Sequence, residues 1–236
     1  MIFLSSPAMI SWKICVSIIA NDTEDAIQKM RMAEPVADIL ELRLDSMRHF
    51  VLEDIIGESK LPLLATYRDP KEGGLKKEVK DEERLRVLKE AIALGIDYVD
   101  IELETDEEWR KELFKDSRKT EIIVSKHLFG PVTEEMLNKY ADKIFATGAD
   151  IGKLIGYAET WQDNLMFLEL VQRYSKKGHR LVSFAMGPYG RPSRIMSPLF
   201  GAAWTYAALK KEEKAAPGQI EASILRKIWE EISCED

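Results

Sequence analysis

The chain has 236 residues, which is long for one ordinary domain and short for two, although α/β barrels reach ~200–250 residues as one unit. Hydrophobic residues make up 45% of it and charged residues 32%, a balance that excludes a disordered or membrane-embedded chain. Lys plus Arg number 34 and Asp plus Glu 41, so the net charge is −7, without any basic block. Nucleic acid is therefore not a predicted partner, and any cations that matter must be few and local.

The two cysteines and the N-terminal segment indicate the cellular compartment in which the protein is expected. Cys15 and Cys234 stand at opposite ends of the chain and offer no CxxC pair, zinc spacing or disulfide framework, which favours a reduced, cytoplasmic location. Residues 1–12 lack the positive start and clear cleavage site of a secretory signal, and they are too short to cross a bilayer. We expect a leading segment that covers one end of the fold and no membrane association, with either Met1 or Met9 as the start.

Short apolar runs alternate with amphipathic stretches along the chain, and no linker divides it. We predict strands at Lys13–Ile19, Asp38–Leu44, Leu61–Tyr67, Ile96–Leu103, Glu121–His127, Ala149–Ile155 and Arg180–Met186, with a less certain one near Leu199–Leu209. Capping signals and apolar residues at helical spacing predict helices over Asp22–Glu34, Asp81–Leu94, from Thr133, over Trp161–Tyr174, and from Pro217 to about Ile232.

Strands that alternate with helices in this way predict a parallel sheet. Seven clear units and an eighth fit a closed (β/α)8 barrel, formed as a single domain over residues 1–236. The rival is an open doubly wound sheet, which needs a glycine-rich turn after the first strand, and Ser17–Asp22 contains no glycine. We therefore predict the barrel, whose functional groups lie at the C-terminal ends of the strands.

Charged residues end the second and third predicted strands. Glu41 and Arg43 face the same way in a strand of period two, so they are either a buried ion pair that braces the barrel or groups that bind a ligand. Arg68 ends the third strand and precedes the turn Glu72-Gly-Gly, a setting that suits an anion.

A histidine and a lysine stand at the next strand ends. His127 closes a predicted buried strand, whereas His49 is expected to open a helix and His179 to lie on a turn. Such an imidazole titrates near neutrality, although a core histidine with satisfied hydrogen bonds explains it equally well. Lys153 lies in the sixth predicted strand, on the same face as Ile151. Lysine is rarely buried without a partner or a function, and burial favours the neutral amine that attacks carbonyls.

The segment after the seventh predicted strand holds one more candidate. Phe184 and Met186 face inward there and are more typical of a core than of a site. Arg194 is predicted at the start of a helix, where a cation is disfavoured by the helix dipole. An anionic ligand bound at that point would explain the arginine.

Six motifs occur in a fixed order between Lys13 and Gln219. They are Glu41-Leu-Arg43-Leu-Asp45, Thr66-Tyr-Arg68 with Glu72-Gly-Gly, Ser125-Lys-His127, Asp150-Ile-Gly-Lys153, Met186-Gly-Pro-Tyr-Gly-Arg-Pro-Ser-Arg194 and Ala216-Pro-Gly-Gln219. Each is only moderately specific, but the ordered set is highly so. In this set the chain resembles the type I 3-dehydroquinate dehydratases, the Schiff-base enzymes of the shikimate pathway.

The resemblance implies a (β/α)8 enzyme that converts 3-dehydroquinate to 3-dehydroshikimate and water, with no metal or organic cofactor and as a homodimer. It implies that Lys153 forms an imine with the C3 ketone, that His127 acts as general acid and base, and that Glu72 orients the histidine. It places substrate contacts at Ser17, Glu41, Arg43, Arg68, Arg194 and Gln219, with Arg194 as the carboxylate clamp. Arginines at the mouth would also repel the charged form of Lys153.

Two positions depart from the family pattern. Ala215 stands where many members have a substrate-binding serine, so a hydrogen bond worth ~0.5–1.5 kcal/mol is lost unless a backbone group replaces it. Phe184 stands where a methionine is frequent, which alters packing but not chemistry. We expect the loop Lys210–Ala216 to be mobile and to close over the substrate.

Two other functions stay open at this point. A lysine-imine aldolase would also carry a buried lysine at a strand end, but the phosphate-binding glycine turns expected after the last two strands are not obvious. A non-catalytic binding barrel would have no need for Lys153, His127 and Glu72 together, although a fold alone does not prove a function.

Overall fold

Eight buried runs form the parallel strands of one sheet. The computed structural model describes residues 12–117 and 119–233. The strands are β1 (Ile14–Ile18), β2 (Ile39–Arg43), β3 (Leu63–Thr66), β4 (Tyr98–Glu102), β5 (Glu121–His127), β6 (Ile151–Tyr157), β7 (Leu181–Met186) and β8 (Thr205–Ala208). Almost all of their residues are buried, as expected for a parallel sheet whose outer face is covered by helices.

Helices cover the outside of the sheet. They are α1 (Thr23–Ala33), α2 (Leu52–Glu58), α3 (Asp81–Ala93), α4 (Glu107–Asp116), α5 (Glu134–Ala146), α6 (Asn164–Lys176), α7 (Arg191–Met196) and α8 (Ala222–Ser233), with 3₁₀ turns η1 (Leu44–Ser46), η2 (Pro70–Glu72) and η3 (Ser197–Phe200). Asp22 and Thr133 begin α1 and α5 by accepting hydrogen bonds from the backbone N–H groups of Asp25 and Met136. Both caps agree with the sequence prediction.

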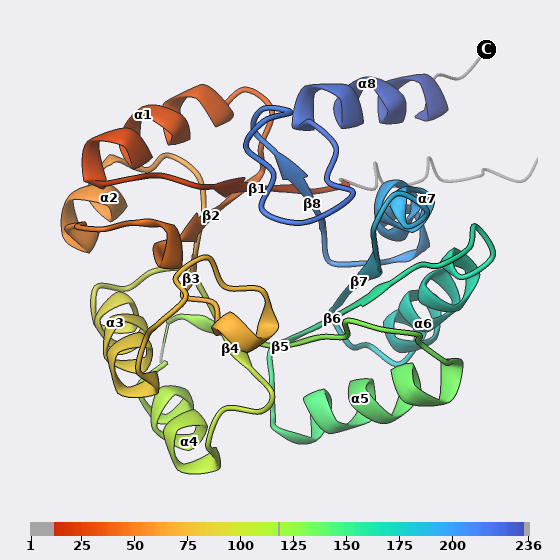
Figure 1. Cartoon of the computed structure of the whole chain (residues 1–236), viewed down its shortest axis with the longest axis horizontal. Coiled ribbons are helices and arrows are strands. Elements are labelled where there is room, and N and C mark those ends of the chain that lie inside the picture. The colour runs from red at the N-terminus through yellow and green to blue at the C-terminus, as the bar shows by residue number, and fades with distance from the viewer. Residues whose placement is uncertain (1–11, 118, 234–236) are drawn as a thin grey trace, which may run out of the picture.

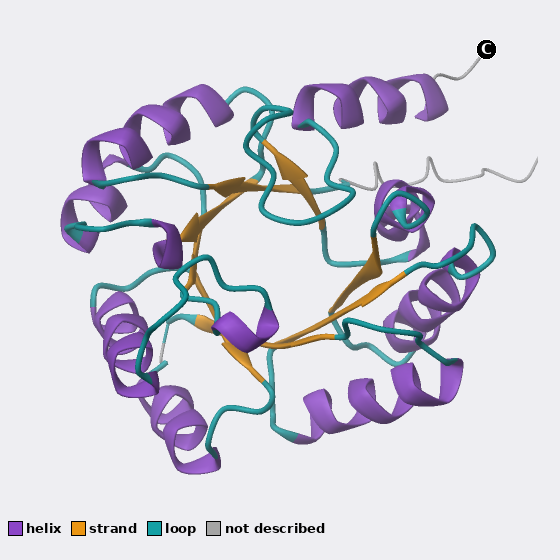
Figure 2. Ribbon diagram, in the orientation of Figure 1, coloured by secondary structure: helices purple, strands orange, loops and turns teal. Residues whose placement is uncertain are grey.

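The strands follow the order β7-β6-β5-β4-β3-β2-β1-β8, so each pairs with its neighbour in the chain except where β1 pairs with β8. Figures 1 and 2 show the strands arranged around a common centre, with the helices outside them. The N–H of Ala203, just before β8, donates to the carbonyl of Leu181 at the start of β7 at 2.9 Å and brings the two ends of the sheet together. The predicted (β/α)8 barrel is confirmed.

Two predicted helix starts are wrong. His49 does not open a helix; it forms a parallel bridge with Asp22, and α2 begins only at Leu52. Pro217-Gly-Gln219 does not open the last helix, which begins at Ala222. Gly218 has a φ of +82°, and a Cβ there would lie 2.4 Å from the carbonyl oxygen of Gly187. The glycine therefore allows a loop to pack against the end of β7, where a helix start had been expected.

Strand alternation divides the core into two parts. One set of side chains, including Ile123, Ile151 and Val182, fills the barrel interior, and the larger set packs between the sheet and the helices. The predicted leading segment, residues 1–12, lies outside the described residues except for Trp12, whose ring packs edge-on against Trp229 of α8. In the described part of the chain, no helix is long and apolar enough to cross a membrane.

Phe167 of α6 offers a test of how the outer layer holds β6. It is fully buried, and its ring occupies the space beside Gly156, where a Cβ would come within 2.7 Å of the ring. We expect Phe167→Ala to lower the free energy of unfolding by about 3–5 kcal/mol, because it opens a cavity in this layer. Leu165→Ala on the same helix, at a residue 61% exposed, should change it by less than about 0.5 kcal/mol. Urea unfolding of both variants makes the measurement, and equal losses would contradict the packing described.

Candidate active site

A cavity of about 110 Å³ lies at the C-terminal ends of the strands, and all nine predicted site residues line it. They are Ser17 on β1, Glu41 and Arg43 on β2, Arg68 after β3, Glu72 on η2, His127 on β5, Lys153 on β6, Arg194 on α7 and Gln219 before α8. Residues far apart in sequence meet because parallel barrel strands end at one rim. Phe184 and Met186, predicted as core, are buried and also form part of the wall.

Lys153 projects from β6 into the cavity with its side chain only 6% exposed. Its Nζ lies 2.9 Å from Oδ2 of Asp100 and 3.5 Å from Oε1 of Glu41, and 4.2 Å from the ring centre of Tyr206. We expected arginines around the amine of Lys153, but its nearest charged neighbours are carboxylates. Two carboxylates oppose the charge of the lysine, and an aromatic face adds a cation–π contact.

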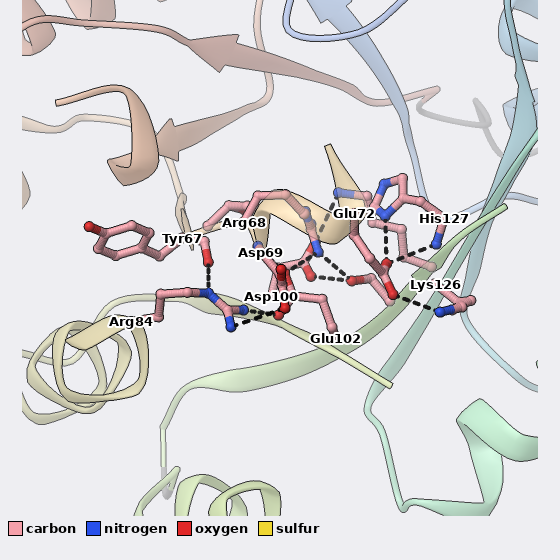
Figure 3. Close-up of polar contacts among 12 residues, drawn as sticks. Tyr67, Arg68, Asp69, Glu72, Arg84, Asp100, Glu102, Lys126 and His127 are labelled. Carbon is pink, nitrogen blue, oxygen red and sulfur yellow. Dashed lines mark hydrogen bonds and ion pairs between the residues drawn. The ribbon is translucent and has the colours of Figure 1, made fainter. Parts of the chain in front are cut away.

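Asp100 and Glu102 are site residues that the sequence reasoning missed. They continue a line of buried ion pairs away from the lysine: Arg68 contacts Asp100 at 2.6 Å and Glu102 at 2.9 Å, and Glu102 also pairs with Arg84 of α3 (Figure 3). Burial raises the pKa of Asp100, but Arg68 and Lys153 outweigh it and hold the pKa well below its usual range. The available signal was two acidic residues at alternate positions at the end of β4.

His127, on the strand β5 that pairs with the strand of Lys153, is held by Glu72 (Figure 3). Oε2 of Glu72 accepts a hydrogen bond from the backbone N–H of His127 at 3.0 Å and lies 3.2 Å from its Nδ1. The turn η2 places this carboxylate, with Asp69 accepting from the N–H of Lys71 and Gly73 ending the turn at a φ of +87°. A carboxylate only accepts, so Nδ1 carries the proton and Nε2 keeps a free lone pair.

Burial and the neighbouring charges and hydrogen bonds together set the pKa values of His127 and Glu72. Burial lowers the pKa of His127 to about 4, with Arg68 and Lys153 adding to the effect and Glu72 opposing it. Burial raises the pKa of Glu72, but hydrogen bonds from His127 and Lys126 and the charge of Arg68 outweigh it and lower the pKa to about 2. At neutral pH the pair is therefore a neutral imidazole beside a carboxylate, which is the form needed for a base.

Arg194 differs from the other arginines of the cavity because no carboxylate of the described chain pairs with it. Its guanidinium is buried, donates only to the carbonyls of Tyr206 at 3.2 Å and Pro217 at 3.5 Å, and lies 4.2 Å from the Phe184 ring centre. Burial lowers its pKa to about 9. Arg194 is the fourth residue of α7, which begins at Arg191. The cavity that it lines therefore accounts for this arginine better than the start of the helix does. A buried cation without a counter-ion is suited to binding an anion.

Arg43 does not form the bracing ion pair with Glu41 that was one of its two predicted roles. Its guanidinium binds both oxygens of Asp45, at 2.9 and 2.8 Å. Glu41 instead accepts hydrogen bonds from Ser17 at 2.7 Å and Thr66 at 3.0 Å. Asp45, the last residue of the motif Glu41-Leu-Arg43-Leu-Asp45, was not predicted to bind Arg43.

The loop before α8 contributes Ala215, Ala216, Pro217 and Gln219 to the lining of the cavity. Nε2 of Gln219 donates to Ser17 at 3.3 Å, and Oε1 of Gln219 accepts from the backbone N–H of Ala215 at 2.7 Å. The backbone N–H of Ala215 therefore supports Gln219, and replacement of the family's substrate-binding serine hydroxyl by a backbone group stays a prediction. Glu213 of this loop forms an ion pair with Lys29 of α1 at 3.2 Å. Among the described residues, no three His, Cys, Asp or Glu side chains gather in a way that could hold a metal ion.

The pKa of His127 gives a direct test of this geometry. We expect the imidazole to titrate at about pH 4 in the resting protein, protonated below and neutral above that pH. Glu72→Gln should lower the midpoint further, because Glu72 raises the pKa through its charge and hydrogen bond. Nuclear magnetic resonance of the imidazole nitrogens measures both. A midpoint near 6.5 in the wild type, or an upward shift in the variant, would contradict the site described.

Comparisons with known proteins agree on one family. The model of the family described as type I 3-dehydroquinase matches residues 14–235. A 3-dehydroquinate dehydratase of Methanocaldococcus jannaschii is 36% identical over 221 residues, which cover 92% of this chain and 97% of that protein. The type I 3-dehydroquinate dehydratase of Clostridium difficile, solved with covalently modified comenic acid, gives a TM-score of 0.81 at 26% identity and covers 93% of this chain and 91% of its own. The 3-dehydroquinate dehydratase of Geobacillus kaustophilus gives 0.81 at 27% identity, with 95% and 93% covered. The chain belongs to the type I 3-dehydroquinase family.

Proposed function

We propose that this protein dehydrates 3-dehydroquinate to 3-dehydroshikimate through an imine on Lys153. The observation that carries the proposal is one cavity that holds a buried lysine, a neutral histidine fixed by a carboxylate, and a buried arginine that no described residue pairs as a counter-ion. Family membership supports this reading over a lysine-imine aldolase and over a non-catalytic barrel. The scheme uses only side chains of this chain, and a cytoplasmic homodimer stays a prediction.

Lys153 begins the reaction by attacking the C3 ketone of the substrate. The ammonium first gives up a proton to Nε2 of His127, and the amine adds to the carbonyl carbon. The imidazolium returns the proton to the departing oxygen, and loss of water leaves a positively charged iminium. Asp100, 2.9 Å from Nζ in the resting protein, stands where it stabilises that charge. The iminium withdraws electrons from the adjacent carbon and so makes the C2 proton acidic.

His127 then moves the proton. Its Nε2 takes the C2 proton, because Nδ1 is occupied by Glu72. The resulting imidazolium gives a proton to the C1 hydroxyl, which leaves as water, and a second water hydrolyses the imine to release product and lysine. Glu72 holds the ring in place through this change of charge and stabilises the imidazolium while it exists.

Arg194 binds the substrate carboxylate in this scheme. An arginine offers two parallel N–H groups to a carboxylate, and this one has no competing anion among the residues described. Gln219, Ser17 and Glu41 are linked by hydrogen bonds along one wall and supply partners for the substrate hydroxyls. Arg43 and Arg68 are already paired with carboxylates, so we assign them to shaping this wall and to hydroxyl contacts.

Replacement of the lysine tests the mechanism. Lys153→Ala should abolish the growth of the ultraviolet band of the conjugated enone when 3-dehydroquinate is added. Borohydride should reduce the iminium of the wild type to a stable secondary amine that mass spectrometry locates on Lys153. His127→Ala should still be trapped but should turn over about 10²–10⁴-fold more slowly. Near-normal turnover by Lys153→Ala would refute the imine, and trapping only with sugar phosphates would favour an aldolase.

Replacement of Arg194 tests the carboxylate clamp. Arg194→Met should raise KM for 3-dehydroquinate by at least ~30-fold, because loss of a buried partner for a charge costs about 2–5 kcal/mol. Arg191→Met, at an exposed position of the same helix, is the matched control and should leave KM unchanged. Steady-state kinetics of the two variants measure the difference. If both have the KM of the wild type, the substrate carboxylate binds elsewhere.

A further inference from the structure

Lys126 contacts the acid–base pair without lining the cavity. Strand alternation on β5 turns Ser125 and His127 toward the barrel interior and Lys126 away from it. Its Nζ nevertheless lies 2.9 Å from Oε1 of Glu72, and its side chain is 16% exposed. Figure 3 shows Lys126 and His127 both directed at the carboxylate of Glu72. No step of the proposed mechanism uses this lysine.

The two oxygens of Glu72 serve different partners. Oε1 binds Lys126, while Oε2 faces both the backbone N–H and Nδ1 of His127. The last torsion of a glutamate side chain is soft, so a carboxylate with only one anchored oxygen can turn. The ion pair at Oε1 therefore fixes where Oε2 lies relative to the imidazole.

The charge of Lys126 also balances that of Glu72. Burial lowers the pKa of Lys126, but the hydrogen bond and charge of Glu72 outweigh it and raise the pKa, so the lysine is charged at neutral pH. Glu72 raises the pKa of His127, while the two other cations that face the ring, Arg68 and Lys153, lower it. Because Lys126 balances the charge of Glu72, the carboxylate orients the ring while raising the pKa of His127 less than an unpaired carboxylate would.

We propose that Lys126 is a positioning residue of the reaction, which holds Glu72 so that Nδ1 of His127 keeps its proton and Nε2 stays free as the base. The inference rests on the proposed function, because it takes His127 as the general base. Lys126 acts through Glu72 and touches no substrate. Without its charge, Glu72 holds an added proton on the imidazole more strongly, so the neutral base is lost at a higher pH.

Lys126→Met tests the inference with two readouts. The value of kcat for 3-dehydroquinate should fall roughly 10-fold, a part of the about 10²–10⁴-fold that a positioned acid–base group contributes, and KM should not change. The pKa of His127 in the resting protein, followed by nuclear magnetic resonance, should rise on the order of one pH unit. Lys126→Arg keeps the charge and the hydrogen bond and should restore both values.

Two further variants sharpen the test. Glu104 is the other carboxylate near Lys126; its side chain is 60% exposed, and its Oε1 lies 3.7 Å from Nζ of Lys126. Glu104→Gln should leave kcat and the His127 titration at wild-type values. Lys126→Gln keeps a hydrogen-bond donor without the charge, so it should shift the His127 pKa upward while losing less kcat than Lys126→Met. It also stands in for the methionine variant if that one folds poorly.

The outcomes separate this inference from the proposed function. The His127 titration needs no turnover, so a wild type that fails to dehydrate 3-dehydroquinate refutes the function while the titration still tests Lys126. Wild-type kcat and wild-type His127 pKa in Lys126→Met would overturn the inference. A raised KM with unchanged kcat would overturn it as well, because the lysine would then be a substrate contact.

Discussion

The ion pair between Lys153 and Asp100 is the interaction on which the rest of the site depends. The two charged atoms lie 2.9 Å apart, and neither side chain is more than 6% exposed. An unopposed charge at such a place costs several kcal/mol, so the barrel holds a lysine there only together with a carboxylate. Asp100 in turn is opposed by Arg68, Arg68 by Glu102, and Glu102 by Arg84 of α3. The amine of Lys153 is thus the inner end of a line of charges that begins at Arg84 of α3, outside the barrel.

The arginines of the cavity differ in whether a carboxylate forms an ion pair with them. Arg43 is bound by Asp45, and Arg68 by Asp100 and Glu102, so neither presents a free charge. Arg194 alone among the cavity arginines of the described chain is buried without such a partner. Attraction for an anion is therefore concentrated at one point, in a protein whose net charge is −7. Local geometry, more than overall charge, determines what this cavity binds.

Some of this arrangement could be predicted from the sequence, and some could not. Lys153 was recognisable because a lysine breaks an apolar run, and strand ends of a barrel share a rim. Asp100 and Glu102 alternate in the same way, but acidic residues at the end of a strand look solvated until their buried partners are known. Pro217 carried the signature of a helix start. The close approach of Gly218 to the end of β7 decides that segment, and such a contact depends on packing that no local pattern specifies.

The hydrogen bond between Ala215 and Gln219 has a consequence for substitutions at position 215. Its donor is the backbone N–H of Ala215, so the contact does not depend on which side chain stands there. A side-chain donor to Gln219 would be lost by a single substitution, whereas this backbone donor is removed only by proline, which has no N–H. A substitution at position 215 by any residue other than proline therefore keeps the donor that holds Gln219. The hold on Gln219 and the side-chain contacts that position 215 makes in the cavity are thus separable by mutation.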